Sequence, residues 1–195
     1  MIKITNITVN DVRFPTSKDQ TGSDAIHKDP DYSATYIIIS TSDNNLKGYG
    51  ITFTLGKGND IVASCIKHFF PIFNGLIIAD IEKDIGKLWF DCVDHSQLRW
   101  LGPEKGVVHL AVSAMFNALW DLIARKNKKP LWQFIVDSEP ETIINWLTFK
   151  YIEDEISLSS TQLENIEEIK WNVSQGRYDI DPIQSDQFSQ SYLYS

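Results

Sequence analysis

Apolar residues alternate with polar ones along three stretches near the start of the chain. Over residues 2–14 the apolar positions recur in pairs with a period of two, but the phase slips between pairs, which predicts a strand with a bulge or a break. Two further strands are expected over residues 34–40 and 47–55, on either side of a turn signal at residues 42–45. Because consecutive strands with short connections usually pair as neighbours, the pattern predicts an antiparallel meander.

After the third strand, apolar residues recur three and four positions apart, the period of a helix that buries one face. Asn59 or Asp60 stands where a side chain can cap the first helix. Pro130 ends the last long helix, since the residue before a proline avoids helical geometry, and then begins a short helix. The helical period therefore predicts three main helices, over about residues 59–73, 81–94 and 106–126.

The last quarter of the chain changes character. Residues 143–152 alternate again and predict one more strand. Residues 159–195 are rich in Ser, Gln, Asn, Asp and Glu, so we expect a partly helical or disordered tail there, with one helix over about residues 160–171. The sequence thus predicts one α+β domain over residues 1–158, a three-stranded meander followed by a helical bundle, and a divergent tail.

Composition narrows the classes of function. A hydrophobic content of 43% is enough for a packed core, and a net charge of -8 disfavours nucleic acid as a partner, because phosphate binding needs clustered cations. One basic cluster does occur, but it lies where a predicted helix ends, and cations there complement the helix dipole. Its members are Arg125, Lys126, Lys128 and Lys129.

Cys65 and Cys92 lie in helical patterns and outside any CxxC pair, so we expect buried free thiols in a reducing compartment, with an interhelical disulfide as the alternative. No leader peptide is evident, and the expected location is intracellular, the cytoplasm first. The long apolar helix is long enough to span a membrane, but polar residues recur along one stripe of it, which favours a core helix with a hydrogen-bonded edge and no membrane partner. The stripe is His109, Ser113, Asn117 and Asp121.

Generic motifs for chemistry are not met. Residues 48–50 lack the third glycine of a dinucleotide fingerprint, and residues 56–58 lack the spacing of a P-loop. The four histidines are isolated, so zinc is not expected. Asp24, Asp29 and Asp31 form an acidic loop that either holds a hard cation or is simply solvated, and the second interpretation fits better because the spacing is not that of an EF-hand. We assign no catalytic residue and no metal ligand.

Several stretches resemble the L-fuconate dehydratase branch of the enolase superfamily, and they occur in the order of that family. The helix that contains ALWDL is general to the superfamily, whereas the Phe-Pro-Thr-Ser, Asp-Pro-Asp-Tyr and Gln-Leu-Arg-Trp-Leu-Gly stretches are specific to this branch. The matching stretches are DVRFPTS from residue 11, GSDA from 22, DPDYSA from 29, GYGITFTLGKG from 48, SQLRWLGPEKG from 96 and NALWDL from 117.

The resemblance implies that residues 1–152 form the N-terminal capping domain that covers a catalytic barrel. It places one wall of the substrate site at residues 52–56, opposite the loop between the first two strands. Buried polar groups on such loops select a polyhydroxy acid, because the wrong sugar leaves them unpaired; the alternative is that these are only turn residues. The implied substrate contacts are Gly22, Ser23, Asp24 and Tyr32.

The reaction implied for the parent enzyme is the Mg²⁺-dependent dehydration of L-fuconate to 2-keto-3-deoxy-L-fuconate, a hydro-lyase reaction of carbohydrate acid catabolism. In that family three carboxylates hold the metal and a lysine or histidine is the base, all at barrel strand ends. The residues after 152 are too few for a barrel. We therefore expect a truncated cap that binds no Mg²⁺ and is inactive alone.

Two other functions remain open. A non-catalytic interaction protein, or pseudoenzyme, would use the exposed underside of the cap, including for self-association. A free-standing sugar-acid binder would hold the ligand without the metal. The resemblance also allows a mitochondrial location as the alternative to the cytoplasm.

Overall fold

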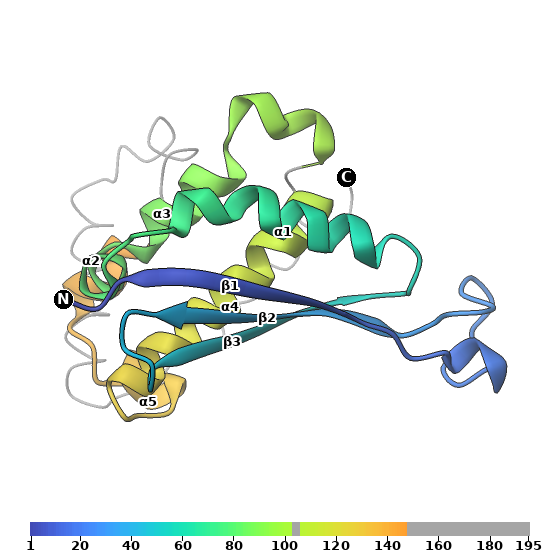
Figure 1. Cartoon of the computed structure of the whole chain (residues 1–195), viewed down its shortest axis with the longest axis horizontal. Helices are drawn as coiled ribbons and strands as arrows, with labels where there is room; N and C mark the ends of the chain where they lie inside the picture. The colour runs from blue at the N-terminus through green and yellow to red at the C-terminus, as the bar shows by residue number, and fades with distance from the viewer. Residues whose placement is uncertain (103–105, 148–195) are drawn as a thin grey trace, which may run out of the picture. The chain divides into compact units, whose positions relative to one another are not determined.

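Residues 1–148 form one compact unit, and within it the computed structural model describes residues 1–102 and 106–147 (Figure 1). The predicted meander is present, with the strands paired antiparallel in the order β1-β2-β3. The register of β1 shifts between Ile4 and Asn6, which is the predicted bulge. The strands are β1 (Ile4–Val12), β2 (Ser33–Thr41) and β3 (Lys47–Thr54).

The helices follow the sheet in sequence, so the α+β class is confirmed. Two short 3-10 turns accompany them, η1 (Thr16–Lys18) in the loop after β1 and η2 (Ser96–Leu101) before the longest helix. The helices are α1 (Asn59–Phe73), α2 (Ile78–Lys83), α3 (Ile85–Val93), α4 (Val107–Lys126), α5 (Leu131–Val136) and α6 (Pro140–Asn145).

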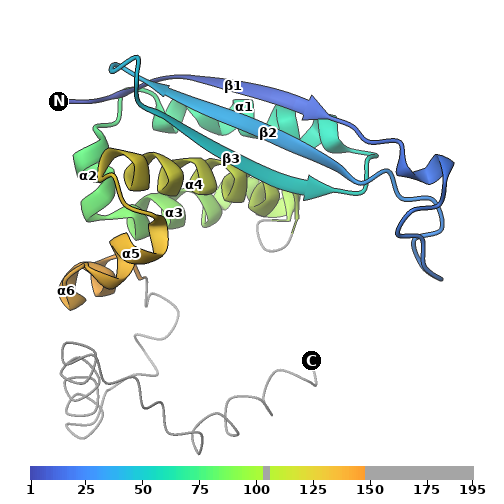
Figure 2. The same ribbon diagram turned by 90° about the horizontal axis from the view of Figure 1, so that it is seen from below.

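The core lies between one face of the sheet and the helices, with α1 along β1 and α4 along β3 (Figure 2). Ile37 and Ile39 of β2 point into it and are fully buried. Gly48 and Gly50 of β3 face α4 so closely that a Cβ on either would overlap a backbone carbonyl oxygen of the helix. Large apolar side chains of α4 pack between the sheet and the other helices, so this helix is the centre of the hydrophobic core.

The apolar helix α4 is long and hydrophobic enough to cross a membrane by length and composition, and most of its residues are buried against the sheet. Its polar stripe is partly hydrogen-bonded, as predicted. Asp121 accepts a bond from the backbone N–H of Tyr49 at 2.9 Å, and Asn117 donates to the carbonyl oxygen of Ile51 at 3.0 Å. These are two of the groups that the last strand of a sheet offers to a further strand, so α4 occupies part of the β3 edge.

The predicted cap of α1 is wrong. The N-cap residue is Gly58, whose φ of 83° suits glycine, and Asn59 is the first residue of the helix with a fully buried side chain. The Asn59 side chain points into the core, where it forms hydrogen bonds with residues on the strands. Asp60 lies in the first turn of the helix and makes no capping bond.

Two other predictions are corrected. The helix expected over residues 81–94 is two helices, because the chain breaks at Asp84, whose carboxylate accepts from Lys87 N at 3.0 Å and caps α3. Residues 140–145 are helical where a strand was expected to begin at residue 143, since Pro140 at the first position favours a helix. Trp146 and Leu147 form a turn and a bend and are not part of a strand. Residues 148–152 of that predicted strand, the helix over 160–171 and the domain boundary after 158 lie outside the described residues.

Both cysteines are free thiols, as expected. Cys92 is fully buried, and burial raises the pKa of its thiol to about 12, with the charge of Asp91 adding to the effect. Cys65 is half-buried, and burial raises the pKa of its thiol as well. The basic cluster at the C-terminal end of α4 is partly paired, Arg125 with Asp121 and Lys126 with Glu82.

Candidate functional site

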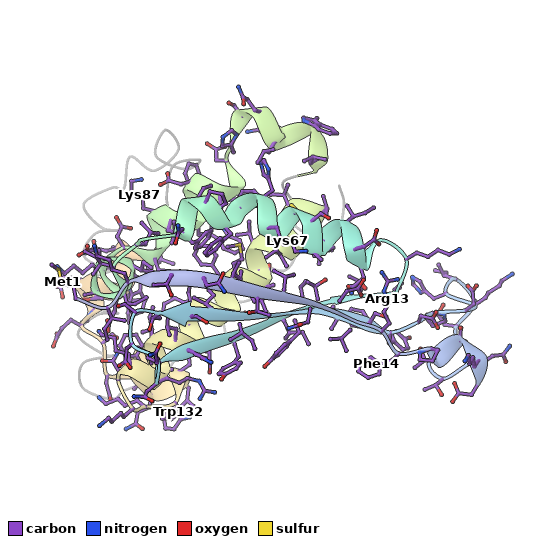
Figure 3. All side chains as sticks on the ribbon, in the orientation of Figure 1. Met1, Arg13, Phe14, Lys67, Lys87 and Trp132 are labelled. Carbon is purple, nitrogen blue, oxygen red and sulfur yellow. The ribbon has the colours of Figure 1, made fainter. Side chains whose placement is uncertain are left out.

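Two loops meet at the end of the sheet opposite the N-terminus (Figure 1). The first loop, residues 13–32, connects β1 to β2, and Arg13 and Phe14 lie at its start (Figure 3). The second loop, residues 55–58, connects β3 to α1. Because β1 and β3 both run antiparallel to β2, the two loops leave from the same end of the sheet, and the four residues expected to contact substrate are on the first loop.

The bases of the two loops are tied together. The Arg13 guanidinium donates twice to the Asp11 carboxylate, both bonds at 2.7 Å, and its third nitrogen donates to the carbonyl oxygen of Gly56 at 3.0 Å. The backbone N–H of Asp31 donates to the carbonyl oxygen of Leu55 at 3.2 Å. The bidentate bond to Arg13, and a further one from Asn59, lower the pKa of Asp11, so the pair is ionised at neutral pH.

Tyr32 joins the first loop to the end of β3. Its ring stacks on that of Phe53 with centroids 5.5 Å apart, and its hydroxyl donates to the carbonyl oxygen of Gly22 at 2.7 Å. Gly22 has a φ of 73°, and a Cβ there would collide with the Tyr32 ring. The structure therefore brings together two of the four predicted contact residues, and glycine is required at position 22 both by its backbone and by the ring beside it.

The other two predicted residues, Ser23 and Asp24, lie at the exposed tip of the first loop. Ser23 donates to the carbonyl oxygen of Lys28 at 2.9 Å. One oxygen of Asp24 accepts from the N–H groups of Ile26 at 2.8 Å and His27 at 2.6 Å, and the other lies 3.1 Å from His27 Nδ1. The backbone bond from His27, its ring and the bond from Ile26 lower the pKa of Asp24 to about 2. These bonds hold the tip in one conformation.

The base of the first loop is closed by a threonine. Thr16 donates its hydroxyl hydrogen to the carbonyl oxygen of Pro30 at 2.7 Å and accepts from the N–H of Tyr32 at 3.0 Å. The N–H of Ser17 donates to Asp31 at 3.1 Å, and hydrogen bonds from Ser17 lower the pKa of that carboxyl. The two ends of the loop are thus bonded to each other before the chain enters β2.

A buried amide lies beneath both loops. The Asn59 side chain donates to Asp11 and to the carbonyl oxygen of Ala34 at 3.1 Å, and accepts from the hydroxyls of Thr35 at 3.0 Å and Thr54 at 2.9 Å. All three strands are therefore bonded to the first turn of α1 through one side chain. This is the physical reason that Asn59 does not cap its own helix.

Neither Phe53 nor Arg13 was predicted as part of the site by name. Phe53 falls in the segment expected to form the opposite wall, but its partner Tyr32 is at the end of the first loop, and no spacing in the sequence reveals such a contact. Arg13 follows Asp11 at the spacing that puts two strand residues on one face, which is a weak signal. Among residues 1–102 and 106–147, no three acidic, histidine or cysteine side chains lie close enough to hold a metal ion, so the described part of the chain does not fit a magnesium site.

The geometry is that of an α+β cap, a sheet and helices that project two joined loops from one end. The chain is 47% identical over 156 residues to mitochondrial enolase superfamily member 1 of Xenopus laevis, covering 80% of this chain and 35% of that protein. It is also 47% identical over 156 residues to the L-galactonate dehydratase of Hypocrea jecorina, with 80% of this chain and 34% of that protein covered. The scan against protein-family models finds no match.

Solved structures agree. The crystal structure of human mitochondrial enolase superfamily member 1 matches with a TM-score of 0.76 and 42% identity, over 85% of this chain and 37% of that chain. A racemase from Streptomyces coelicolor A3(2) with bound magnesium has a TM-score of 0.53 at 24% identity, over 70% of this chain and 35% of that one, and shows the fold alone. This chain is thus homologous to enolase-superfamily proteins and has the fold of their N-terminal cap, as the sequence predicted. It spans about a third of the length of these relatives.

Proposed function

We propose that this chain is the capping part of an acid-sugar dehydratase of the L-fuconate dehydratase branch. The observation that carries the proposal is the joined pair of loops, held by the Tyr32–Phe53 stack and the Arg13–Gly56 bond in a chain homologous to an L-galactonate dehydratase. A cap whose two loops keep a fixed separation presents a defined surface to a ligand beneath it.

The substrate class follows from the groups that the loops offer. Ser23 and Asp24 supply oxygens, and Tyr32 supplies a ring face with a polar tip, which suit a molecule with several hydroxyls and one carboxylate. Asp24 would accept from substrate hydroxyls through lone pairs that its bonds to the loop backbone leave free. Closing such loops over a sugar acid also excludes water from a charged intermediate.

Catalysis belongs to the rest of the parent enzyme in this proposal. The described residues offer no magnesium site, although magnesium is bound in a racemase of this fold. The chain alone would then have no dehydratase activity. Purified chain incubated with L-fuconate and Mg²⁺ should yield no 2-keto-3-deoxy acid, and turnover at the rate of an enzyme would refute this part.

A chimera tests the loops. The region of the Hypocrea jecorina enzyme that aligns with residues 1–147 of this chain is replaced by those residues, and dehydration of L-fuconate and L-galactonate is followed. We expect an active chimera in which Asp24→Asn lowers kcat/KM about tenfold or more. Asp29→Asn, a carboxylate of the same loop outside the implied contact set, should stay within about twofold. Equal kcat/KM for the Asp24 variant and the parent chimera would refute the assignment.

The second candidate function is a non-catalytic interaction protein, and exposed aromatic surface favours it. Trp100 is 80% exposed and Trp132 is 67% exposed. A hollow of about 330 Å³ between α3 and α4 is lined by Trp89, Trp120 and Trp146. A stable complex of the purified chain with another protein, without dehydratase activity in the chimera, would favour this candidate over the first.

The location of the protein is proposed on the same basis. The relatives in Xenopus laevis and Bos taurus carry the name mitochondrial enolase superfamily member 1. We expect this chain in mitochondria or the cytoplasm, and imaging of a tagged chain in its own cells distinguishes the two.

A further inference from the structure

The face of the sheet that points away from the helices carries an apolar stripe along β2 and β3. The alternation that sends Ile37 and Gly50 toward α4 sends their neighbours outward. Ile51 is 50% exposed and Phe53 is 56% exposed, and among the described residues the helices all lie on the other face (Figure 2). We name this set the β2–β3 stripe: Tyr36, Ile38, Tyr49, Ile51 and Phe53.

The side chains of the β2–β3 stripe contact one another, and the stripe covers β2 and β3 but not β1. The rings of Tyr36 and Tyr49 stack with centroids 6.5 Å apart, and the Arg125 guanidinium lies 4.8 Å above the Tyr49 ring from the β3 edge. Three outward positions of β1 in contrast are polar, Asn6, Thr8 and Asn10, and the fourth is Val12 at the end of the strand. The face is therefore apolar over β2 and β3 and mostly polar over β1.

The two ends of the face differ in charge. The loop between β1 and β2, residues 13–32, has four aspartates against two lysines and Arg13, and Arg13 pairs with Asp11. The opposite end has Lys3, Lys47 and Arg125 around the start of β1 and β3, against Asp43 in the turn and Asp121, which pairs with Arg125. Lys47 is exposed and shares the outward side of β3 with Ile51, so cations and carboxylates lie at opposite ends of one surface.

We propose that the β2–β3 stripe is a self-association surface, and that two copies of this chain pack sheet face to sheet face about a two-fold axis that lies perpendicular to the strands. That axis keeps β3 over β3, so the stripe of one copy covers the stripe of the other. It also reverses the strand direction, which brings the basic end of each copy over the acidic loop of its partner. A two-fold axis along the strands would place acidic loop on acidic loop.

Part of the β3 edge is already bonded. Asp121 and Asn117 of α4 occupy the N–H of Tyr49 and the carbonyl oxygen of Ile51, which are two of the groups that a further strand would need. The apolar face is a surface through which a second copy gains from contact. The β2–β3 stripe shares Phe53 with the candidate site, but the dimer forms and is measured without substrate, so its test is separate from that of the proposed function.

Sedimentation velocity of the 195-residue chain over the micromolar range tests the proposal, with circular dichroism as the check on folding. We expect a reversible dimer, and Ile51→Lys should raise its Kd about tenfold or more, since a charge replaces an apolar contact. Ile61→Lys is the matched control, because Ile61 is 59% exposed on α1. A monomer at every concentration, or an equal effect of the two variants, would overturn the proposal.

Charge reversal tests the orientation of the two copies with variants that leave the core untouched. Lys47→Glu should weaken the dimer, because it sets two acidic surfaces against each other, and adding Asp29→Lys in the same chain should restore part of the affinity. A dimer that neither substitution changes would overturn the antiparallel arrangement. If the dimer placed the two acidic loops together, Lys47→Glu would not weaken it, and the double variant would have no lost affinity to restore.

Discussion

Tyr32 stacks on Phe53, and through this contact the loop that follows β1 is held against the last residues of β3. The same tyrosine donates to the carbonyl oxygen of Gly22, near the tip of its own loop. One side chain therefore links the tip, the base and the opposite wall of the candidate site. The position of the tip relative to the sheet depends on a residue that lies outside the tip itself.

The first prediction concerns this link. Tyr32→Phe keeps the stack and removes the bond to Gly22, so amide hydrogen exchange at Ser23 and Asp24 should accelerate about fivefold, the effect of roughly 1 kcal/mol. Tyr32→Leu removes both contacts and should accelerate exchange further. Tyr49→Phe, at the other end of the sheet, is the control and should leave the loop unchanged. Unaltered exchange in both Tyr32 variants would show that the tip is held by its own bonds alone.

The second prediction concerns Asn59. Asn59→Ala leaves the hydroxyls of Thr35 and Thr54 and the carboxylate of Asp11 without their shared partner, so we expect a loss of about 2–4 kcal/mol in the free energy of unfolding. Asn74→Ala, in the exposed residue after the same helix, should change it by about 0.5 kcal/mol or less. Urea unfolding followed by circular dichroism measures both, and equal losses would contradict the role given to the buried amide.

The third prediction concerns the contact of β3 with α4. A methyl group at Gly50 would overlap the carbonyl oxygen of Ala114, and backbone cannot rotate away as a side chain can, so Gly50→Ala should cost about 3 kcal/mol. Gly75→Ala is the control, because its φ of 86° strains alanine while nothing lies near the added methyl, which predicts about 1–2 kcal/mol. A Gly50 variant as stable as the Gly75 variant would mean that α4 shifts to make room.

The sequence predicted the meander and α4 because local patterns decide both. Alternation and a short turn specify adjacent strands, and an unbroken apolar run that ends before Pro130 specifies a helix. The prediction for Asn59 failed because tertiary contacts decide its position. Asparagine is a good capping residue, but the hydroxyls of Thr35 on β2 and Thr54 on β3 donate to its side chain in the core. Asp84 falls within a continuous helical period, and only its bond to Lys87 shows that a new helix starts there.

The candidate site was predictable only in part. Composition located the polar loop, and the family resemblance selected Gly22, Ser23, Asp24 and Tyr32, whose roles toward a substrate remain proposals. That Gly22 and Tyr32 bond to each other follows from the path of the loop, which no local pattern encodes. The contribution of Phe53 likewise depends on the pairing register of β2 and β3, because that register brings position 53 opposite Ala34 and beside Tyr32.

The last prediction concerns the pH dependence of the loop tip. Hydrogen bonds from the N–H and ring of His27 and the N–H of Ile26 lower the pKa of Asp24 from its usual 3.8 to about 2. Because the pKa is lower in the folded loop, the ionised carboxylate stabilises the tip fully above its usual pKa, and this contribution is lost as the pH falls through about 2. The tip should therefore keep its conformation in mild acid.

Carbon-detected NMR of the Asp24 carboxyl group measures this directly, and the amide shifts of Ile26 and His27 should follow the same titration. In Asp24→Asn the side-chain oxygen still accepts hydrogen bonds but does not ionise, so the step in the two amide shifts should disappear while the bonds persist. A midpoint at or above 3.8 would contradict the prediction, because it would mean that the carboxylate gains nothing from the two N–H groups that face it. The tip would then owe its conformation to the contacts of Ser23 and Tyr32.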